Sequence, residues 1–206
     1  MVIGKSVQRV DGVAKVTGKA RYADDLTMPG MRVAKYLRST IAHGRVRSID
    51  TSKAETLPGV DGVYTFKDVP KIIFATAGHP FSLDPHHMDV ADRYLLTDHV
   101  RYMGDEIAIV VGVNDLIVQK ALSLIDVEYE SYQPLVRNAD VLAAEVEIHK
   151  GTKNIVKSHS FVAGGSLEEV KATCDHLLEG RYKTQIVQHC HLENHTAYAY
   201  MDDTQR

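Results

Sequence analysis

The sequence predicts an α+β fold, because one stretch reads as a strand, a helix and a second strand in succession. Residues 106–113 form a near-continuous apolar run, which is typical of a strand buried on both faces. Asn114 can cap a helix over 115–122, with Asp115 at the positive helix end. Residues 124–129 alternate as a strand, so the three elements resemble a split α/β unit.

Turn chemistry and alternation predict the elements that precede this stretch. In chain order we expect a turn-rich arm over residues 1–30, strands over 31–37 and 46–49, a helix that Asp50 or Thr51 caps and Pro58-Gly59 ends, and a strand over 62–66. Residues 67–98 are an irregular excursion that contains Pro70, Pro80 and Pro85. A loop of this length within a compact domain is often functional or interfacial.

The remainder of the chain is predicted to be a connection followed by one helix and two strands. Residues 133–165 carry proline, glycines and scattered polar residues, as a connection does. Ser166 and Glu169 then form a capping-box pattern for a short helix. We expect strands over 176–186 and 196–201, where β-branched and aromatic residues recur.

Composition is that of an ordinary globular protein and excludes several classes of partner. Of 206 residues, 44% are hydrophobic and 25% are charged, which is enough for a real core. With a net charge of −3 and no Trp, neither a basic surface for nucleic acid or anionic membrane nor a base-stacking platform is expected. Two cysteines suit a reducing compartment. Because neither a signal peptide nor an apolar run of about 18 residues is present, we expect a cytoplasmic protein.

The densest group of metal-ligating residue types lies near the end of the chain. Glu193 shares strand parity with His189, His191 and His195, and such a set can bind zinc or iron. Alternate positions on a flat strand lie along a line, however, and not around a tetrahedron. We therefore interpret the histidines as structural side chains or neighbours of a metal site. Cys190, of opposite parity, is expected to be a small buried side chain.

Other candidate groups have simpler interpretations. The adjacent His86 and His87 could bind a soft metal, but a solvated loop explains them. Asp105 and Glu106 stand where a turn feeds a strand, which explains both carboxylates without acid–base chemistry. Cys174 lies at a helix end, where the helix dipole disfavours a thiolate, so it is a poor nucleophile. The sequence has no Ser–His–Asp, CxxC or HExxH pattern.

Several short segments carry a resemblance when they are taken together and in order. They are residues 7–25, 38–44, 57–60, 69–70, 101–110, 127–130 and 188–195. The second is similar to an R-S-P-x-A-H-A turn with Thr40 in place of proline, and the last to a Q-x-x-x-L-E-P stretch with Asn194 in place of proline. In order and spacing the segments resemble the molybdenum-binding subunits of bacterial xanthine dehydrogenases, in the xanthine dehydrogenase and aldehyde oxidase family.

The resemblance implies a division of the chain and a set of cofactors. After an N-terminal arm over 1–14, residues 15–132 would form the family's α/β hammerhead domain. A linker over 133–154 would lead to the first strands of an incomplete molybdopterin-binding domain over 155–206. The parent enzyme would hydroxylate a purine or related N-heterocycle with oxygen from water. It would use molybdopterin cytosine dinucleotide, with [2Fe–2S] clusters and FAD on partner domains or subunits.

The functional motifs of the family cannot be placed on this sequence. The Gly-Gly-x-Gly-Phe-Gly cofactor loop, the glutamine near molybdenum and the base glutamate of a Gly-Glu-Pro-Pro motif all lie downstream in the family. The resemblance therefore assigns no catalytic, cofactor-binding or metal-binding residue here. We expect an inactive N-terminal fragment, whose parent has iron–sulfur and FAD partners. Apolar strand edges over 155–206 favour its homodimerisation or disorder.

Two other functions stay open at this point. A free-standing hammerhead module could bind partner subunits through residues 67–98 and 133–165. A small metal-binding protein could use His189, His191 and His195, in which case the purified protein would carry near-stoichiometric metal.

Overall fold

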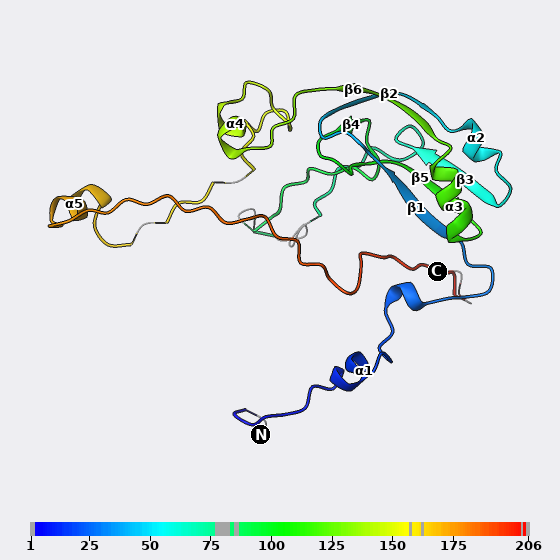
Figure 1. The fold of residues 1–206 in the computed structure, drawn as a ribbon, viewed down its shortest axis with the longest axis horizontal. Coiled ribbons are helices and arrows are strands. Elements are labelled where there is room, and N and C mark those ends of the chain that lie inside the picture. Colours follow the sequence, from blue (N-terminus) through cyan, green and yellow to red (C-terminus); the bar gives the residue numbers. More distant parts are fainter. Residues whose placement is uncertain are drawn as a thin grey trace. The chain divides into compact units, whose positions relative to one another are not determined.

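The computed structural model of the chain describes residues 3–76, 83–84, 87–156, 158–161, 163–202 and 204. The chain divides into two compact units. One unit is Gly30–Ala163, and the other joins Met1–Pro29 to Gly164–Arg206. All strands of the described residues belong to Gly30–Ala163 (Figure 1).

The first sheet of the Gly30–Ala163 unit is built on its central strand, β5 (Glu106–Gly112). β1 (Val33–Arg38) and β3 (Val60–Thr65) both run antiparallel to β5, one on each side. Val110 of β5 stands opposite Val63 of β3. The clearest strand signal in the sequence therefore lies at the centre of the sheet, where both edges of the strand are hydrogen-bonded.

The second sheet is also three-stranded and antiparallel. β2 (Gly44–Asp50) lies between the short β4 (His99–Val100) and β6 (Asp126–Ser131). β4 was not predicted, because two residues are too few to show a periodic pattern. The predicted strand–helix–strand unit requires correction: its strands, β5 and β6, belong to different sheets, so the helix between them connects the two sheets.

Two helices pack against the first sheet (Figure 1). α2 (Ser52–Glu55) is shorter than predicted, whereas α3 (Asp115–Leu122) has the predicted bounds. The side chain of Asn114 accepts the Ile117 N–H at 2.9 Å, which confirms the predicted cap. The helices and the sheet enclose one core cluster, made of Ala54, Val110, Val118, Ala121 and Ile125.

β5 is covered on both faces, as its apolar run predicted. Val110 is fully buried in the cluster beneath the helices. Ile107 is fully buried in a second cluster, with Val46 of β2 and Val100 of β4. Each such buried side chain contributes roughly 1.5–3 kcal/mol relative to an exposed one. β5 thus joins the core of the helices to the core of the second sheet.

Two irregular stretches complete this unit. Between β3 and β4, the predicted excursion is anchored by a bridge, in which the Phe74 and Arg93 backbones exchange hydrogen bonds of 2.9 and 3.1 Å. Residues 133–154 were expected to be a linker. They contain a short helix, α4 (Asn138–Ala143), and belong to the same compact unit as the sheets.

The other unit contains short helices and extended chain. Its helices are α1 (Gly12–Val16), the 3-10 helix η1 (Ala23–Asp25) and α5 (Leu167–Ala172). The predicted capping box at α5 is confirmed. The Ser166 hydroxyl accepts the Glu169 N–H at 3.2 Å, and the Glu169 carboxylate accepts the Ser166 N–H at 3.1 Å.

The strands predicted over 176–186 and 196–201 were wrong for the described residues. This backbone pairs with no strand, and apolar side chains such as Leu178 (98% exposed) and Ile186 (fully exposed) project from it. A strand is stabilised by a hydrogen-bonded partner, and alternation in a sequence supplies none. The exposed apolar side chains agree with the expectation for 155–206, while dimerisation and disorder stay predictions.

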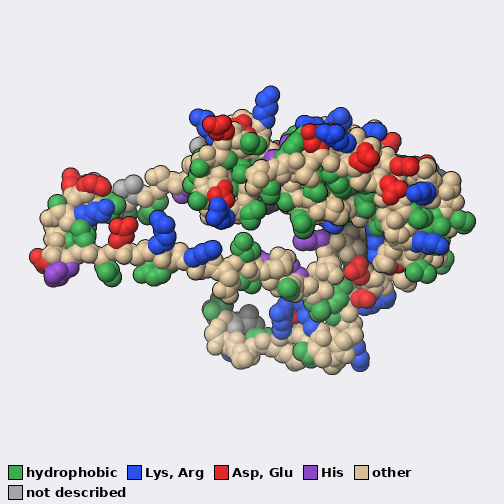
Figure 2. All heavy atoms as spheres, turned by 45° about the horizontal axis from the view of Figure 1, so that its top comes forward, with side chains coloured by type: hydrophobic (Ala, Val, Ile, Leu, Met, Phe, Trp, Pro, Cys, Tyr) green, Lys and Arg blue, Asp and Glu red, His purple; other side chains and the backbone are tan. Residues whose placement is uncertain are grey.

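The surface of the sheet-containing unit mixes both signs of charge. Figure 2 shows Lys and Arg side chains interspersed with Asp and Glu side chains over it. Ion pairs contribute to this mixture, such as Arg45 with Asp98 at 3.2 Å. Across the described residues, no helix has the length and apolar character to cross a membrane. Pro80, Pro85 and His86, singled out in the sequence, lie outside the described residues.

Candidate functional site

The histidine-rich stretch near the end of the chain does not gather into a metal-binding cluster. His189 and His191 stack ring on ring, with centroids 5.3 Å apart and planes 6° apart. The Glu193 carboxylate accepts the Ala23 backbone N–H at 3.4 Å. Within the described part of the chain, no three His, Cys, Asp or Glu side chains are arranged to hold a metal ion.

Cys190 lies within this stretch and corrects one prediction. It was expected to be buried, but its thiol is exposed, as is that of Cys174. The backbone of Cys190 has φ +51°, a conformation that no strand residue adopts. Strand parity therefore does not apply at this position, and the burial inferred from parity fails with it.

The turn that feeds β5 interlocks with the turn that follows β1. The Ser39 N–H donates to the Asp105 carbonyl oxygen at 2.8 Å, and the Gly104 N–H donates to the Ser39 carbonyl oxygen at 2.9 Å. Arg38 forms an ion pair with Glu106 at 2.6 Å. Gly104 takes φ +94°, which glycine adopts without strain. The turn therefore accounts for the position of both carboxylates, as the sequence interpretation expected.

A polar network extends from this turn to the irregular excursion. Arg93 donates to the Glu106 carboxylate and to the Tyr102 hydroxyl, each at 2.5 Å. Asp105, which is 5% exposed, accepts the Arg101 N–H at 3.0 Å. Burial raises the pKa of Asp105, and that N–H partly offsets the shift by stabilising the carboxylate. The network fastens the excursion to β5.

A pair of stacked histidines lies on the second sheet. His43 is 3% exposed, and its Nδ1 donates to the Gln133 carbonyl oxygen at 3.1 Å. Its ring stacks on that of His99 with centroids 5.8 Å apart. Burial and nearby arginines lower the pKa of His99 to about 4, so its ring is neutral at pH 7.

At Gly44 a Cβ would lie 2.1 Å from the Glu130 carbonyl oxygen, so this approach of β2 to β6 requires glycine.

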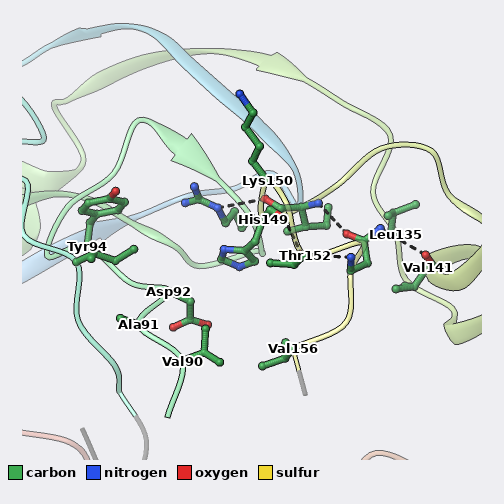
Figure 3. A pocket seen from close by; sticks show the side chains of 14 residues that line it. Val90, Ala91, Asp92, Tyr94, Leu135, Val141, His149, Lys150, Thr152 and Val156 are labelled. Atoms are coloured by element: carbon green, nitrogen blue, oxygen red, sulfur yellow. Dashed lines mark hydrogen bonds between the residues drawn. The ribbon is translucent and has the colours of Figure 1, made fainter. Parts of the chain in front are cut away.

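A cavity of about 480 Å³ opens between the end of the excursion and residues 148–156 (Figure 3). Its walls are mainly apolar, with contributions from Val90, Leu135, Val141, Ile148 and Val156. A smaller cavity of about 90 Å³ is lined by some of the same residues, namely Asp92, Tyr94, Arg101 and His149. The large chamber and the small chamber therefore adjoin.

Sequence patterns did not indicate the charged residues of these chambers. Arg101 and His149 lie far apart in the chain, and neither belongs to a spacing motif for a ligand. The sequence indicated only the segments: the excursion over 67–98, whose length is typical of functional or interfacial loops, and the connection over 133–165, a possible contact surface, both form parts of the cavity wall.

The fold places the chain in a known class of proteins. A family model described as aldehyde oxidase and xanthine dehydrogenase, a/b hammerhead domain, matches residues 17–133. The chain belongs to this family, which confirms the predicted fold class and the resemblance. Among its relatives is the xanthine dehydrogenase molybdenum-binding subunit of Escherichia coli O157:H7, 46% identical over 96% of this chain and 26% of that protein.

Other relatives extend the comparison. The nicotinate dehydrogenase large molybdopterin subunit of Eubacterium barkeri is 30% identical over 98% of this chain and 45% of its own length. The solved aldehyde oxidoreductase from Desulfovibrio gigas matches with a TM-score of 0.69 and 30% identity, over 81% of this chain and 19% of that one. The chain spans about a quarter of the length of the first curated relatives it matches.

Relatives named for molybdenum or molybdopterin raise the question of whether the described residues fit that cofactor. They do not. The extended chain around His189 and His191 is exposed, and the large cavity brings together one imidazole and one carboxylate, from His149 and Asp92, with no thiol. No catalytic step through molybdenum is therefore assigned to the described residues.

Proposed function

We propose that this chain is the N-terminal part of a molybdenum hydroxylase subunit, and that the parent enzyme oxidises purines or related N-heterocycles with water as the oxygen source. The observation that carries the proposal is the 46% identity over 96% of the chain to a xanthine dehydrogenase molybdenum-binding subunit. In the proposal, residues 1–14 are an arm, 15–132 the hammerhead domain, 133–154 a linker and 155–206 the start of the molybdopterin-binding domain.

The proposal gives the chain a structural role within the parent enzyme. Molybdopterin cytosine dinucleotide is bound by the rest of the subunit, and [2Fe–2S] clusters and FAD on partner domains or subunits carry the electrons away. The chain alone supplies no catalytic, cofactor-binding or metal-binding residue and does not hydroxylate. We also propose a cytoplasmic location, since two exposed free thiols suit a reducing compartment.

A chimera tests the proposal. The matched part of the Escherichia coli O157:H7 relative is replaced by residues 1–206, and the hybrid is produced with the other subunits of that enzyme. We expect bound molybdenum by elemental analysis and xanthine-dependent dye reduction within about tenfold of the parent, because the proposal assigns residues 1–206 the same place in the subunit as the 46% identical segment that they replace.

The matched control is the same chimera with Val110→Asp, which places an unpaired carboxylate in the core and should abolish both signals. A chimera that accumulates as folded protein but carries neither molybdenum nor activity would overturn the proposal.

The second candidate function is the free-standing module that binds partner subunits. One observation favours it: the Gly30–Ala163 unit has a hydrophobic core of its own, which consists of two clusters of buried residues. Light scattering of the 206-residue chain mixed with iron–sulfur and FAD subunits distinguishes the candidates. A stable complex supports the free-standing module, whereas a chain that binds neither subunit counts against this function.

A further inference from the structure

We propose that the two adjoining chambers of the Gly30–Ala163 unit form a binding site for a small organic acid, a carboxylate on an aromatic or branched aliphatic body. The large chamber, of about 480 Å³, lies within the range of small-molecule sites. Such sites combine apolar walls with a few polar groups, and this one does so (Figure 3). The site is independent of the molybdenum chemistry proposed above.

Charge indicates the sign of the ligand. The charged side chains around the large chamber are those of Arg101, Lys150 and Asp92. Lys150 is exposed and its amine points away from the cavity in Figure 3, so Arg101 is the cation that favours an anionic ligand. Within the described residues the partly buried Arg101 guanidinium donates to the backbone carbonyl oxygens of His99 at 3.3 Å and Ile148 at 3.4 Å and forms no ion pair with a carboxylate. The charge of buried Asp105, which lines the small chamber with it, acts on it without an ion-pair contact. Because a partly buried cation is stabilised by a counter-ion, an anionic group fits beside Arg101.

The imidazole of His149 defines the junction of the two chambers, because it lines both. In Figure 3 its ring lies next to Asp92, which belongs with Tyr94 to the end of the excursion. A neutral ring at this place offers one donor and one acceptor to the polar end of a ligand. The apolar body would then lie against Val90 and Val156, at the other end of the labelled wall.

The wall that carries His149 is fixed in shape before any ligand arrives. Asn154 accepts the Ile148 N–H at 2.8 Å and donates to the Val146 carbonyl oxygen at 2.9 Å. Glu147 accepts the N–H groups of Gly151 at 2.6 Å and of Lys153 at 2.8 Å. These side-chain bonds hold a loop that has little regular structure, and a preformed wall lowers the ordering cost of binding.

The same wall contains two consecutive residues in the left-handed region. Lys153 has φ +50° and Asn154 has φ +59°, and neither is glycine. Left-handed non-glycine residues cost free energy, and they persist where the surrounding bonds over-determine them, often at ligand sites. The strain therefore agrees with a wall shaped for a ligand.

Calorimetric titration of the 206-residue chain with 1-naphthoate tests the site, with neutral 1-naphthamide as the uncharged probe. We expect Arg101→Gln to weaken naphthoate at least about tenfold, the effect of losing one charged hydrogen bond, and to change naphthamide less than twofold. Arg101→Lys keeps the charge and should recover most of the naphthoate affinity. Ala91→Phe, which fills the chamber from an exposed position, should abolish binding of both probes.

The matched control is Arg137→Gln, since Arg137 is 81% exposed, pairs with Asp140 and lies outside the chamber. It should leave both affinities unchanged. Absence of naphthoate binding at millimolar concentration would overturn the proposal. Binding that survives both Arg101→Gln and Ala91→Phe would also overturn it, because the acid would then occupy another part of the chain, such as exposed apolar residues of 176–201.

Discussion

The strand β5 offers the sharpest test of the fold, because its two faces belong to different core clusters. Val110→Ala removes two methyl groups from a side chain with no exposed surface. At about 0.8 kcal/mol per buried carbon, the transfer loss is about 1.6 kcal/mol, and the cavity left behind raises the total to about 2–3 kcal/mol. On the opposite face, Ile107→Ala removes one more carbon, and we expect a loss of about 2–5 kcal/mol.

Urea unfolding followed by far-UV circular dichroism measures both losses, since the chain has no Trp to serve as a fluorescent probe. With a slope of about 1–3 kcal/mol per molar urea, the Val110→Ala midpoint should fall by roughly 0.7–3 M. Val136→Ala is the matched control, because Val136 is 80% exposed, and it should cost less than about 0.5 kcal/mol. A core substitution that costs no more than this control would show that its face of β5 is open, and the two-sided arrangement would be refuted.

Three further predictions concern individual side chains. Because burial lowers the pKa of His99 to about 4, below its ordinary value of 6.5, the unfolded chain binds the proton more readily. The contribution of His99 to stability is therefore complete above pH 6.5 and lost as the pH falls toward 4. An NMR titration of its ring with a midpoint near 6.5 would contradict this. Asn114→Ala should cost about 1 kcal/mol in urea unfolding by removing the cap of α3, and Asn114→Ser should retain most of the stability; equal stability of wild type and Asn114→Ala would exclude the cap. Cys174 and Cys190 should both react with a thiol reagent in the folded protein, and a protected Cys190 would restore the burial first expected from its parity.

The sequence could predict elements whose signal is local. The β5 run and the Asn114 cap are of this kind, because consecutive residues carry the pattern and the physics that it reports. The residues over 176–186 carry an equally clear strand pattern and form no strand in the described residues. The pattern reports that one face of the segment is apolar, but a strand also needs a neighbour, and no local signal says whether one is present.

The candidate site was harder to predict, because the fold assembles it from distant parts of the chain. Arg101 and His149 both line the large chamber, although neither lies in a recognisable ligand motif. Their meeting depends on the hydrogen bond from Arg101 to the Ile148 carbonyl oxygen and on the loop that Asn154 holds. Such a juxtaposition follows from tertiary contacts alone.

The segments that carried the family resemblance acquire a physical meaning from the structure. Residues 38–44 and 101–110 are two of them, and they are far apart in the sequence. In the fold they interlock, since Ser39 exchanges backbone hydrogen bonds with Gly104 and Asp105, and Arg38 pairs with Glu106. A change in either turn would leave buried backbone groups of the other unpaired. The two motifs are therefore one structural feature, and their joint presence indicates the hammerhead domain more specifically than either motif alone.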